Sequence, residues 1–387
     1  MRPPRHGPPM TTFTLFMNPR HGTPGIVTLP AAGFRRAKAE ITSWEGYAHT
    51  PLRDLPLPGT IRLKDESGRF GLGSFKALGG AYAVVNLLAG ELSRRGVAPS
   101  ARSADLTSGR YAEATGAITI ASATDGNHGR AVAWAASRFH CRCVIYLHAT
   151  VSAGREAAIG AYGAEIRRVP GTYDDAVHAC ARDAETNGWF VVSDTSWPGY
   201  TEIPRDIMQG YRLMADEAAD QWTGPAPTHV FIQGGVGGAA AAVAVQTRAR
   251  WNPAPALIVV EPDRAACLLT SAQAGRLTLV GGELDTIMAG LACGEPSLLA
   301  WQELERSATA FMAIPDAAAI ATMRLLATSG IVAGESGVAG LAGFRLAMGD
   351  TEAASALGLD AGSRVLAFNT EGATDPLLYE QLVRGSA

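Results

Sequence analysis

A lysine near the start of a helix is the first candidate for covalent chemistry in this sequence. A predicted strand over residues 60–64 leads through a glycine-rich loop to a helix that we expect to begin at Ser74, a residue type favoured at helix N-termini. Lys76 then lies in the first helical turn, where the helix dipole and partial burial disfavour its ammonium form. A neutral amine is what a Schiff base requires. A solvated lysine beside a capping serine is the alternative interpretation.

A second segment, Asp125-Gly126-Asn127-His128-Gly129, joins the end of a strand to a helix. Its glycines allow backbone amides to face an anion, so a substrate carboxylate or a phosphate fits there. The alternative is a helix that is simply capped by Asp125 or Asn127. We expect His128 to be a structural loop histidine.

Four glycines, Gly234, Gly235, Gly237 and Gly238, separate a buried strand from an alanine-rich helix. No side chain blocks an anion from their amides, so this turn predicts a phosphate-binding cup. Dinucleotide-binding folds contain a similar turn, with an acidic residue about 20 residues further on. Glu261 lies somewhat later than that, which leaves a dinucleotide site as the weaker alternative.

Two polar residues at strand ends complete the set of candidates. Asp194 follows one predicted strand, and Thr370 stands at the end of another, where its hydroxyl could meet a ring nitrogen. Ordinary Asx and Ser/Thr turns use the same residue types, so both interpretations stay open from these residues alone.

Short β-branched runs alternate with alanine-rich helical stretches along nearly the whole chain, which is typical of α/β proteins with parallel sheets covered by helices. The length of 387 residues exceeds the usual size of a single core. We therefore predict two lobes, each with a mostly parallel twisted sheet, and a cleft between them. The expected strands are 60–64, 117–121, 142–147, 165–169, 190–192, 229–232, 257–261 and 365–368.

The predicted large domain comprises residues 1–88 and 229–387, and the small domain residues 89–228. Residues 224–227 (Gly-Pro-Ala-Pro) mark a break between them, and residues 94–115 are expected to be a loop insertion. Residues 1–9, rich in Pro, Arg and His, are expected to be a disordered tail, with Met10 as a candidate natural start.

Bulk properties exclude several classes of function. A formal net charge of -3, without a basic run or an acidic tail, gives no electrostatic basis for binding nucleic acid or a membrane. No stretch approaches the roughly 20 uninterrupted apolar residues of a spanning helix. The five cysteines form no zinc framework, and unpaired thiols, including Cys267 and Cys293, fit a reducing cytoplasm. These properties do not exclude an enzyme that acts on small polar substrates.

Five segments in this order resemble the tryptophan-synthase-type (fold type II) enzymes that use pyridoxal 5'-phosphate (PLP), and most closely the diaminopropionate ammonia-lyases. The likeness runs from about Thr60 to Pro376, and its most specific segments are KDESGRFGLGSFKALGG, ATDGNHGRAVAWAA, DTSWPGYTEIP, TIMAGLACGEPS and GESG. Gly73-Ser74 departs from the Asn-Ala of the family, and residues 94–115 form a longer insertion than usual. These departures affect loop geometry and leave the lysine in place.

The resemblance implies a role for each matching residue. Lys76 would hold PLP as an internal aldimine, Asn127 would donate to the phenolic oxygen of the ring, and Thr370 would meet the pyridine nitrogen. A hydroxyl cannot keep that nitrogen protonated, and such a ring is a weaker electron sink, which favours elimination from Cβ. The implied cofactor-binding residues are Lys76, Phe75, Asn127, Gly234, Gly235, Val236, Gly237, Gly238, Glu335 and Thr370, and the implied substrate-binding residues are Thr124, Asp125, Gly126 and Asp194.

Asp125 indicates which group would leave from Cβ. Serine and threonine dehydratases of the same fold carry a small residue there, whereas a carboxylate attracts a β-ammonium group and can accept a proton. The resemblance assigns bases on opposite faces of the substrate, and we expect Asp125 to act on D-diaminopropionate and Asp194 on the L-isomer. The aminoacrylate would then hydrolyse to pyruvate, with two ammonia released in all.

Three alternatives stay open. The chain could be a lyase of the serine/threonine dehydratase type, or an enzyme that performs β-replacement on a β-substituted alanine. A nucleotide-binding regulatory module that uses only the glycine turn would leave Lys76, Asp125 and Asp194 unexplained. The resemblance also implies a homodimer and no metal.

Overall fold

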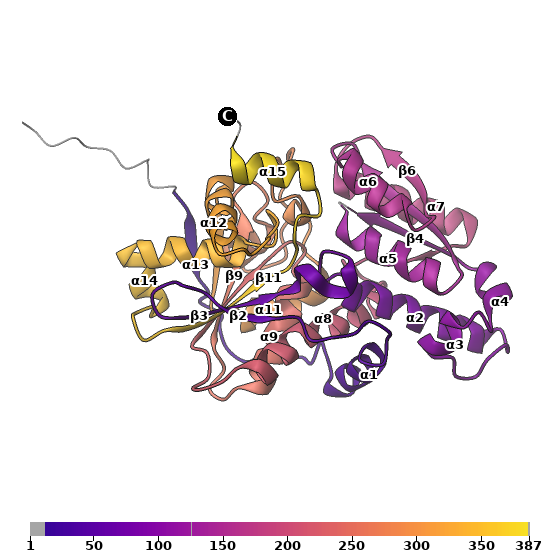
Figure 1. Cartoon of the computed structure of the whole chain (residues 1–387), viewed down its shortest axis with the longest axis horizontal. Helices are drawn as coiled ribbons and strands as arrows, with labels where there is room; N and C mark the ends of the chain where they lie inside the picture. The colour runs from indigo at the N-terminus through magenta and orange to yellow at the C-terminus, as the bar shows by residue number, and fades with distance from the viewer. Residues whose placement is uncertain (1–11, 125, 386–387) are drawn as a thin grey trace, which may run out of the picture.

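The computed structural model describes residues 12–124 and 126–385, which contain two β-sheets in separate lobes (Figure 1). The larger sheet has seven strands. In spatial order they are β1 (Thr14–Met17), β10 (Ala310–Ile314), β9 (Ala256–Pro262), β8 (His229–Gln233), β11 (Arg364–Asn369), β3 (Thr60–Asp65) and β2 (Leu52–Asp54). The inner strands pair in parallel, and only the edge strands β1 and β2 pair antiparallel in this part of the chain.

The smaller sheet is entirely parallel across its four described strands. Its spatial order is β6 (Glu165–Val169), β5 (Arg142–His148), β4 (Thr119–Thr124) and β7 (Phe190–Val191). Parallel strands are buried on both faces, which explains why runs such as His229–Gln233 are buried at every position. The α/β class and the two mostly parallel sheets predicted from the alternation are confirmed, whereas the domain boundaries remain a prediction.

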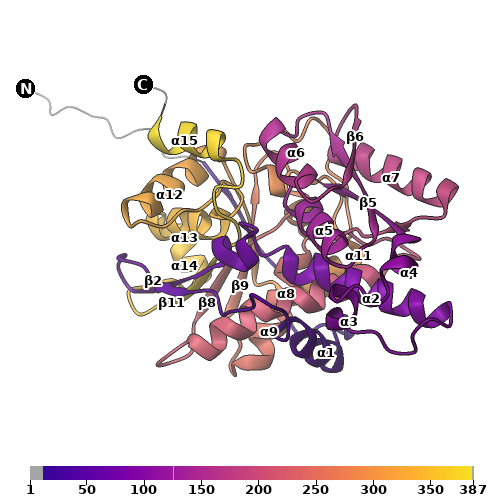
Figure 2. The same cartoon turned by 45° about the vertical axis from the view of Figure 1, so that its right-hand side comes forward.

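Helices connect the strands and pack on both sheets (Figure 2). The helices of the large lobe and of the junction are α1 (Ala31–Ile41), α2 (Ala77–Arg94), α8 (Glu202–Gln221), α9 (Gly238–Arg250), α10 (Cys267–Ala274), α11 (Leu298–Ser307), α12 (Asp316–Thr328), α13 (Ala339–Gly349), α14 (Thr351–Leu357) and α15 (Pro376–Arg384). Those beside the smaller sheet are α3 (Ser103–Thr107), α4 (Ala112–Gly116), α5 (Asn127–Arg138), α6 (Ala153–Gly160) and α7 (Tyr173–Asn187). Two 3₁₀ helices, η1 (Glu66–Gly71) and η2 (Ala289–Leu291), complete the described elements. None of the described helices is long and apolar enough to cross a membrane.

The helix α2 joins the two lobes because it packs against both α8 and α5. We expected this helix to begin at Ser74, but it begins at Ala77, and Lys76 occupies the N-cap position. Ser74 instead forms an isolated bridge with Glu371. The serine therefore anchors the approach to the helix, and Lys76 itself stands at the helix end.

The segment 94–115 is not the irregular loop that its composition suggested. It contains α3 and α4, and Leu106 is buried in the core with 1% of its surface exposed. At the start of α3, the Asp105 side chain accepts a hydrogen bond from the backbone of Arg102 at 3.0 Å. Helices of five residues are too short to produce a visible apolar period, which explains why the sequence pattern missed them.

A buried network of charges fixes the segment that leads to Lys76. Glu217 on α8 accepts hydrogen bonds from Lys64 Nζ and from Arg69 Nη2, both at 2.7 Å, and Arg69 Nε also donates to Glu66 at 2.8 Å. All four side chains are at most 1% exposed. Because a buried charge is costly unless it is paired, this network ties β3 and η1 firmly to α8.

Candidate active site

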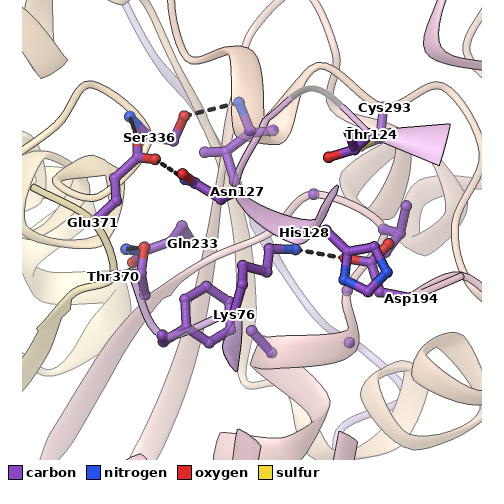
Figure 3. Close-up of a pocket in the computed structure, with 18 of the residues that line it drawn as sticks. Lys76, Thr124, Asn127, His128, Asp194, Gln233, Cys293, Ser336, Thr370 and Glu371 are labelled. Atoms are coloured by element: carbon purple, nitrogen blue, oxygen red, sulfur yellow. Dashed lines mark hydrogen bonds and ion pairs between the residues drawn. The ribbon is translucent and has the colours of Figure 1, made fainter. Parts of the chain in front are cut away.

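A cavity lies where strands from both sheets end, the position at which open parallel α/β sheets bind ligands. Its walls follow the ends of β4, β8 and β11, so segments far apart in the sequence meet there (Figure 3). The lining residues are Phe75, Lys76, Ala123, Thr124, Asn127, His128, Tyr173, Asp194, Tyr211, Gln233, Gly235, Val236, Gly237, Gly238, Ala239, Gly290, Leu291, Cys293, Ser336, Thr370 and Glu371.

Lys76 points into this cavity and forms an ion pair with Asp194. The distance from Lys76 Nζ to Asp194 Oδ2 is 2.5 Å, and the lysine side chain is 18% exposed (Figure 3). Burial alone would favour the neutral carboxyl, but the Lys76 charge and the nearby His128 hold the pKa of Asp194 below its usual range. We had expected an uncharged amine. The sequence singled out Asp194 as a candidate base, but it did not predict that this carboxylate pairs with Lys76.

The glycine turn between β8 and α9 has the geometry that an anion cup requires, and its binding of phosphate stays a prediction. Gly237 has a φ of +97° and caps α9, a helix of 13 residues. A Cβ at Gly237 would approach Ala300 Cβ to 3.0 Å, and one at Gly235 would approach the Gly290 oxygen to 3.2 Å. Within the described residues, the amides of positions 235–238 donate to no carbonyl or side chain, whereas Gly234 N donates to Val260 O at 2.8 Å. The open amides and the helix dipole suit a phosphate.

Glu261 does not serve this cup, which removes the support for a dinucleotide site. Its carboxylate is fully buried and accepts hydrogen bonds from the backbone amides of Leu268 and Leu269, both at 2.8 Å. It therefore caps α10 behind the turn. Burial raises the pKa of Glu261 to about 8, against the opposing effect of the two amides.

Thr370 follows β11 and lines the same cavity with a buried hydroxyl. Gln233, the last residue of β8, donates from Nε2 to Thr370 Oγ1 at 2.7 Å. The backbone oxygen of Thr370 accepts from the amide of Phe75 at 3.1 Å, which links this wall to the segment that carries Lys76. Phe75 also packs on Tyr211, with ring centroids 4.6 Å apart.

Asn127 begins α5 and donates from its side-chain amide to Glu371 (Figure 3). The second N–H of that amide remains available for a ligand. Thr124 Oγ1 orders the same loop because it accepts from the amides of Gly126 and Gly129, both at 2.9 Å. Asp125, the predicted second base, lies outside the described residues.

Glu335 occupies a different place from the other predicted cofactor ligands. It does not line the cavity but forms a buried ion pair with Arg155 of α6, which connects the two lobes. Burial and the neighbouring Glu371 raise the pKa of Glu335, while Arg155 opposes the shift. Gly334 and Gly337 beside it pass so close to the segment 369–372 that a Cβ would meet its backbone or side chains within 2.5–3.0 Å.

Sequence reasoning missed several residues of the cavity. His128, interpreted as a loop histidine, is 2% exposed, and its Nδ1 lies 3.9 Å from Asp194 Oδ2. The hydroxyl of Tyr173 lies 3.5 Å from the other oxygen of Asp194. Gln233, Tyr211 and Glu371 also line the wall. His128, Gln233 and Glu371 lie within or beside segments that the sequence analysis singled out, but their residue types gave no signal of a role in the cavity. Tyr173 and Tyr211 lie outside those segments.

A lysine, an open phosphate cup and a buried hydroxyl in one cleft between two parallel α/β lobes define an enzyme of the PLP-dependent class. The family described as "Pyridoxal-phosphate dependent enzyme" matches residues 44–371. The diaminopropionate ammonia-lyase of Salmonella typhimurium is 40% identical over 358 residues, which cover 87% of this chain and 88% of the relative.

Solved structures give the same result. The holo diaminopropionate ammonia-lyase of Escherichia coli superposes with a TM-score of 0.86 and 36% identity, covering 96% of this chain and 97% of the other. Another structure of that enzyme, in complex with an aminoacrylate-PLP azomethine reaction intermediate, has the same score and coverage. This chain belongs to the diaminopropionate ammonia-lyase family of the fold type II PLP-dependent enzymes.

The residues present fit PLP. The amides of positions 235–238 suit its phosphate, and Lys76 lines the same cavity. Thr370 has a buried hydroxyl in the cavity, and the Asn127 side-chain amide has one further N–H; these groups would suit the pyridine nitrogen and the phenolic oxygen of the ring. The described residues contain no group of three or more His, Cys, Asp or Glu side chains placed to hold a metal ion.

Proposed function

We propose that this chain binds PLP through Lys76 and eliminates ammonia from 2,3-diaminopropionate. One water is consumed, and pyruvate and two ammonia are released. The observation that carries the proposal is the Lys76–Asp194 pair, which lines the same cavity as the glycine turn at positions 235–238. The cofactor supplies the electron withdrawal that weakens the bond from Cα to its proton.

Asp194 is suited to be a base in this reaction. The Lys76 charge lowers the pKa of Asp194 and keeps it ionised, so it can attract the β-ammonium group of the diamine. We assign it as the acceptor of the Cα proton because it lines the cavity in contact with Lys76. Lys76, 2.5 Å away, can exchange a proton with it. His128 lies near the same carboxylate oxygen, Oδ2, at 3.9 Å, and the Tyr173 hydroxyl lies 3.5 Å from the other oxygen. We assign Asp125 as the base for the D-isomer and Asp194 as the base for the L-isomer.

The remaining assignments are part of the same proposal. Phe75, Asn127, Val236, Glu335, Thr370 and the four glycines of the cup would hold the cofactor, directly or through neighbours. Thr124, Gly126 and the two aspartates would hold the substrate. We also propose that the enzyme is cytoplasmic and that it is a homodimer. Light scattering of the purified protein tests the homodimer.

The attachment of the cofactor is tested by Lys76→Ala. This variant should lose the visible absorbance that a lysine-bound cofactor gives, because no other amine in the described cavity can replace Lys76. Lys38→Ala is the matched control, since Lys38 lies on α1 in a partly exposed pair with Asp216 and should keep the absorbance. An unchanged absorbance spectrum in Lys76→Ala would refute the attachment of the cofactor to Lys76.

The choice of substrate is tested by measuring pyruvate from diaminopropionate and from serine at equal concentration. The diamine should be consumed faster than serine, because the ionised carboxylate of Asp194 attracts the β-ammonium group of the diamine. The neutral hydroxyl of serine gains no such attraction. A preference for serine or threonine would favour a dehydratase. Product analysis with an added nucleophile separates elimination from β-replacement.

The division between the bases is tested by Asp194→Asn with each enantiomer. Turnover of the L-isomer should fall by about 10²–10⁴-fold, the usual contribution of a general base, while turnover of the D-isomer is largely kept. The visible absorbance of the variant controls for cofactor binding. An equal loss for both enantiomers would contradict the assignment.

A further inference from the structure

Gln233 stands between the phosphate cup and the residue that faces the ring nitrogen. It is the last residue of β8, is 4% exposed and directly precedes the glycine turn. Its side-chain nitrogen Nε2 lies 2.7 Å from Thr370 Oγ1, 2.7 Å from Gly337 O and 3.2 Å from Phe368 O. One amide group therefore touches β11, the start of α13 and Thr370 together.

The neighbours of Gln233 determine which way its amide points. Two of the three atoms around Nε2 are backbone carbonyl oxygens, which can only accept hydrogen bonds. A flipped amide would bring its own oxygen against both carbonyls, so the nitrogen must face them. The nitrogen has two protons, and its two shortest contacts, both at 2.7 Å, are Gly337 O and Thr370 Oγ1, while Phe368 O lies further away at 3.2 Å. Gln233 therefore donates to Thr370, and the Thr370 hydroxyl accepts.

This fixed direction decides what the Thr370 hydroxyl can do. A hydroxyl has a single proton, and here the oxygen already receives a bond from Gln233. Among the described residues the Thr370 hydroxyl donates to no acceptor, although Thr370 is only 4% exposed and lines the cavity. A buried donor without a partner is costly, so its proton is left for a ligand atom that accepts.

We infer that Gln233 is a positioning residue that holds the Thr370 hydroxyl as a donor to an unprotonated ring nitrogen of the cofactor. The inference rests on the proposed binding of PLP and adds a residue to it. A neutral pyridine nitrogen is an acceptor, which matches the free proton of Thr370, whereas a protonated nitrogen would require an acceptor. Through one side chain, the strand that leads to the phosphate cup also sets the hydrogen bond at the far side of the ring.

The test removes the donor of Gln233 and follows the holoenzyme. Gln233→Met keeps a side chain of similar length without an N–H, so the Thr370 hydroxyl is no longer oriented. Loss of bound cofactor after dilution into a trapping reagent, measured by visible absorbance, should become about fivefold faster, the effect expected for one weakened hydrogen bond.

A double-mutant cycle shows whether Gln233 acts through the hydroxyl of Thr370. Gln233→Met should accelerate cofactor loss in a Thr370→Ser background, which keeps a hydroxyl. It should have little further effect in a Thr370→Val background, where no hydroxyl remains to be oriented. A merely structural role of Gln233 would give the same acceleration in all three backgrounds.

Gln209→Met is the matched control for the loss of a buried glutamine. Gln209 lies on α8, is 2% exposed and donates to Pro30 O at 3.0 Å, away from the cavity. Its substitution should lower the thermal unfolding midpoint without accelerating cofactor loss.

Two results would overturn the inference: an unchanged rate of cofactor loss in Gln233→Met, or an equal acceleration in the Thr370→Val background. Failure of the proposed function is distinguishable from either. A wild-type protein without visible absorbance would show that the cofactor itself is not bound, and a lack of turnover with diaminopropionate would leave the rates of cofactor loss unaffected.

Discussion

The crossing of α2 and α8 holds Lys76 in place, and the substitution Gly79→Ala tests how strictly. The two helices pack directly against each other (Figure 1). Lys76 before α2 and Tyr211 on α8 both line the cavity. A Cβ at Gly79 would lie 2.6 Å from Ile207 O and 2.5 Å from Tyr211 Cε1, whereas ordinary contacts begin at 3.4 Å. The helices must therefore separate by about 0.8 Å, or the buried Tyr211 ring must move toward Phe75.

Two opposing effects set the magnitude for Gly79→Ala. Overpacking in a buried contact costs about 1–3 kcal/mol, and alanine recovers about 0.5–1 kcal/mol of helix stability relative to glycine. We expect a net loss of about 1–2 kcal/mol in the free energy of unfolding. Because Gly79 lies three residues after Lys76, the displacement also reaches the amine, and misplacement by about 1 Å can cost about a hundredfold in rate.

Thermal unfolding and turnover of diaminopropionate provide the assay for this prediction. Gly90→Ala is the control on the same helix, since a Cβ at Gly90 meets nothing within 4 Å. That substitution should raise stability slightly and leave turnover unchanged. If Gly79→Ala were as stable and as active as Gly90→Ala, the close crossing would not be what positions Lys76.

Two further predictions concern buried carboxylates. Glu261 has its pKa raised from 4.5 to about 8, so the stability associated with its protonated form is fully present below about pH 4.5 and is lost as pH rises through 8, by at most about 5 kcal/mol. Glu261→Gln should remove this loss, and denaturant unfolding across pH 5–9 measures it. Arg155→Met should cost about 3–5 kcal/mol because it leaves Glu335 buried without its cation, and adding Glu335→Gln should restore part of that stability.

The results that would contradict these two predictions also differ. For Glu261→Gln, the contrary result is a difference from wild type that stays constant over the whole pH range. For Arg155→Met, the contrary result is a double variant that is no more stable than the single one. Since burial raises the pKa of Glu335, the loss in Arg155→Met should grow as pH rises through that pKa.

Much of the fold could be predicted because its strands are local patterns. The run over residues 165–169 was placed with both ends correct, and the other expected strands overlap observed ones with ends that differ by up to three residues. The strand β10 (Ala310–Ile314) was missed because Ala-Phe-Met-Ala-Ile is apolar throughout and has neither alternation nor β-branched residues before its end. The edge strands β1 and β2 were missed because they are short and pair antiparallel.

Part of the candidate site could be predicted, because some of its residues stand at turns and helix starts that the local sequence indicates. Gly237 caps α9 with a positive φ, and Lys76 stands at the start of α2, as their local sequences indicate to within a residue or two. The ion pair between Lys76 and Asp194 could not be predicted, since 118 residues separate them and only the path of the chain brings them together. The same holds for Glu335, whose partner is Arg155 and not the cavity.

The sequence by itself determined the glycine turn before α9 and the approach to α2, which present open backbone amides and the amine of Lys76. Both are local features, because φ and ψ are limited by sterics between neighbouring residues. Tertiary structure alone decided which charged and hydrogen-bonding groups face each other. Gln233 illustrates the difference, since its effect on Thr370 arises only when β8 and β11 lie side by side. Side-chain partners depend on packing between distant segments, and local sterics carry no information about that packing.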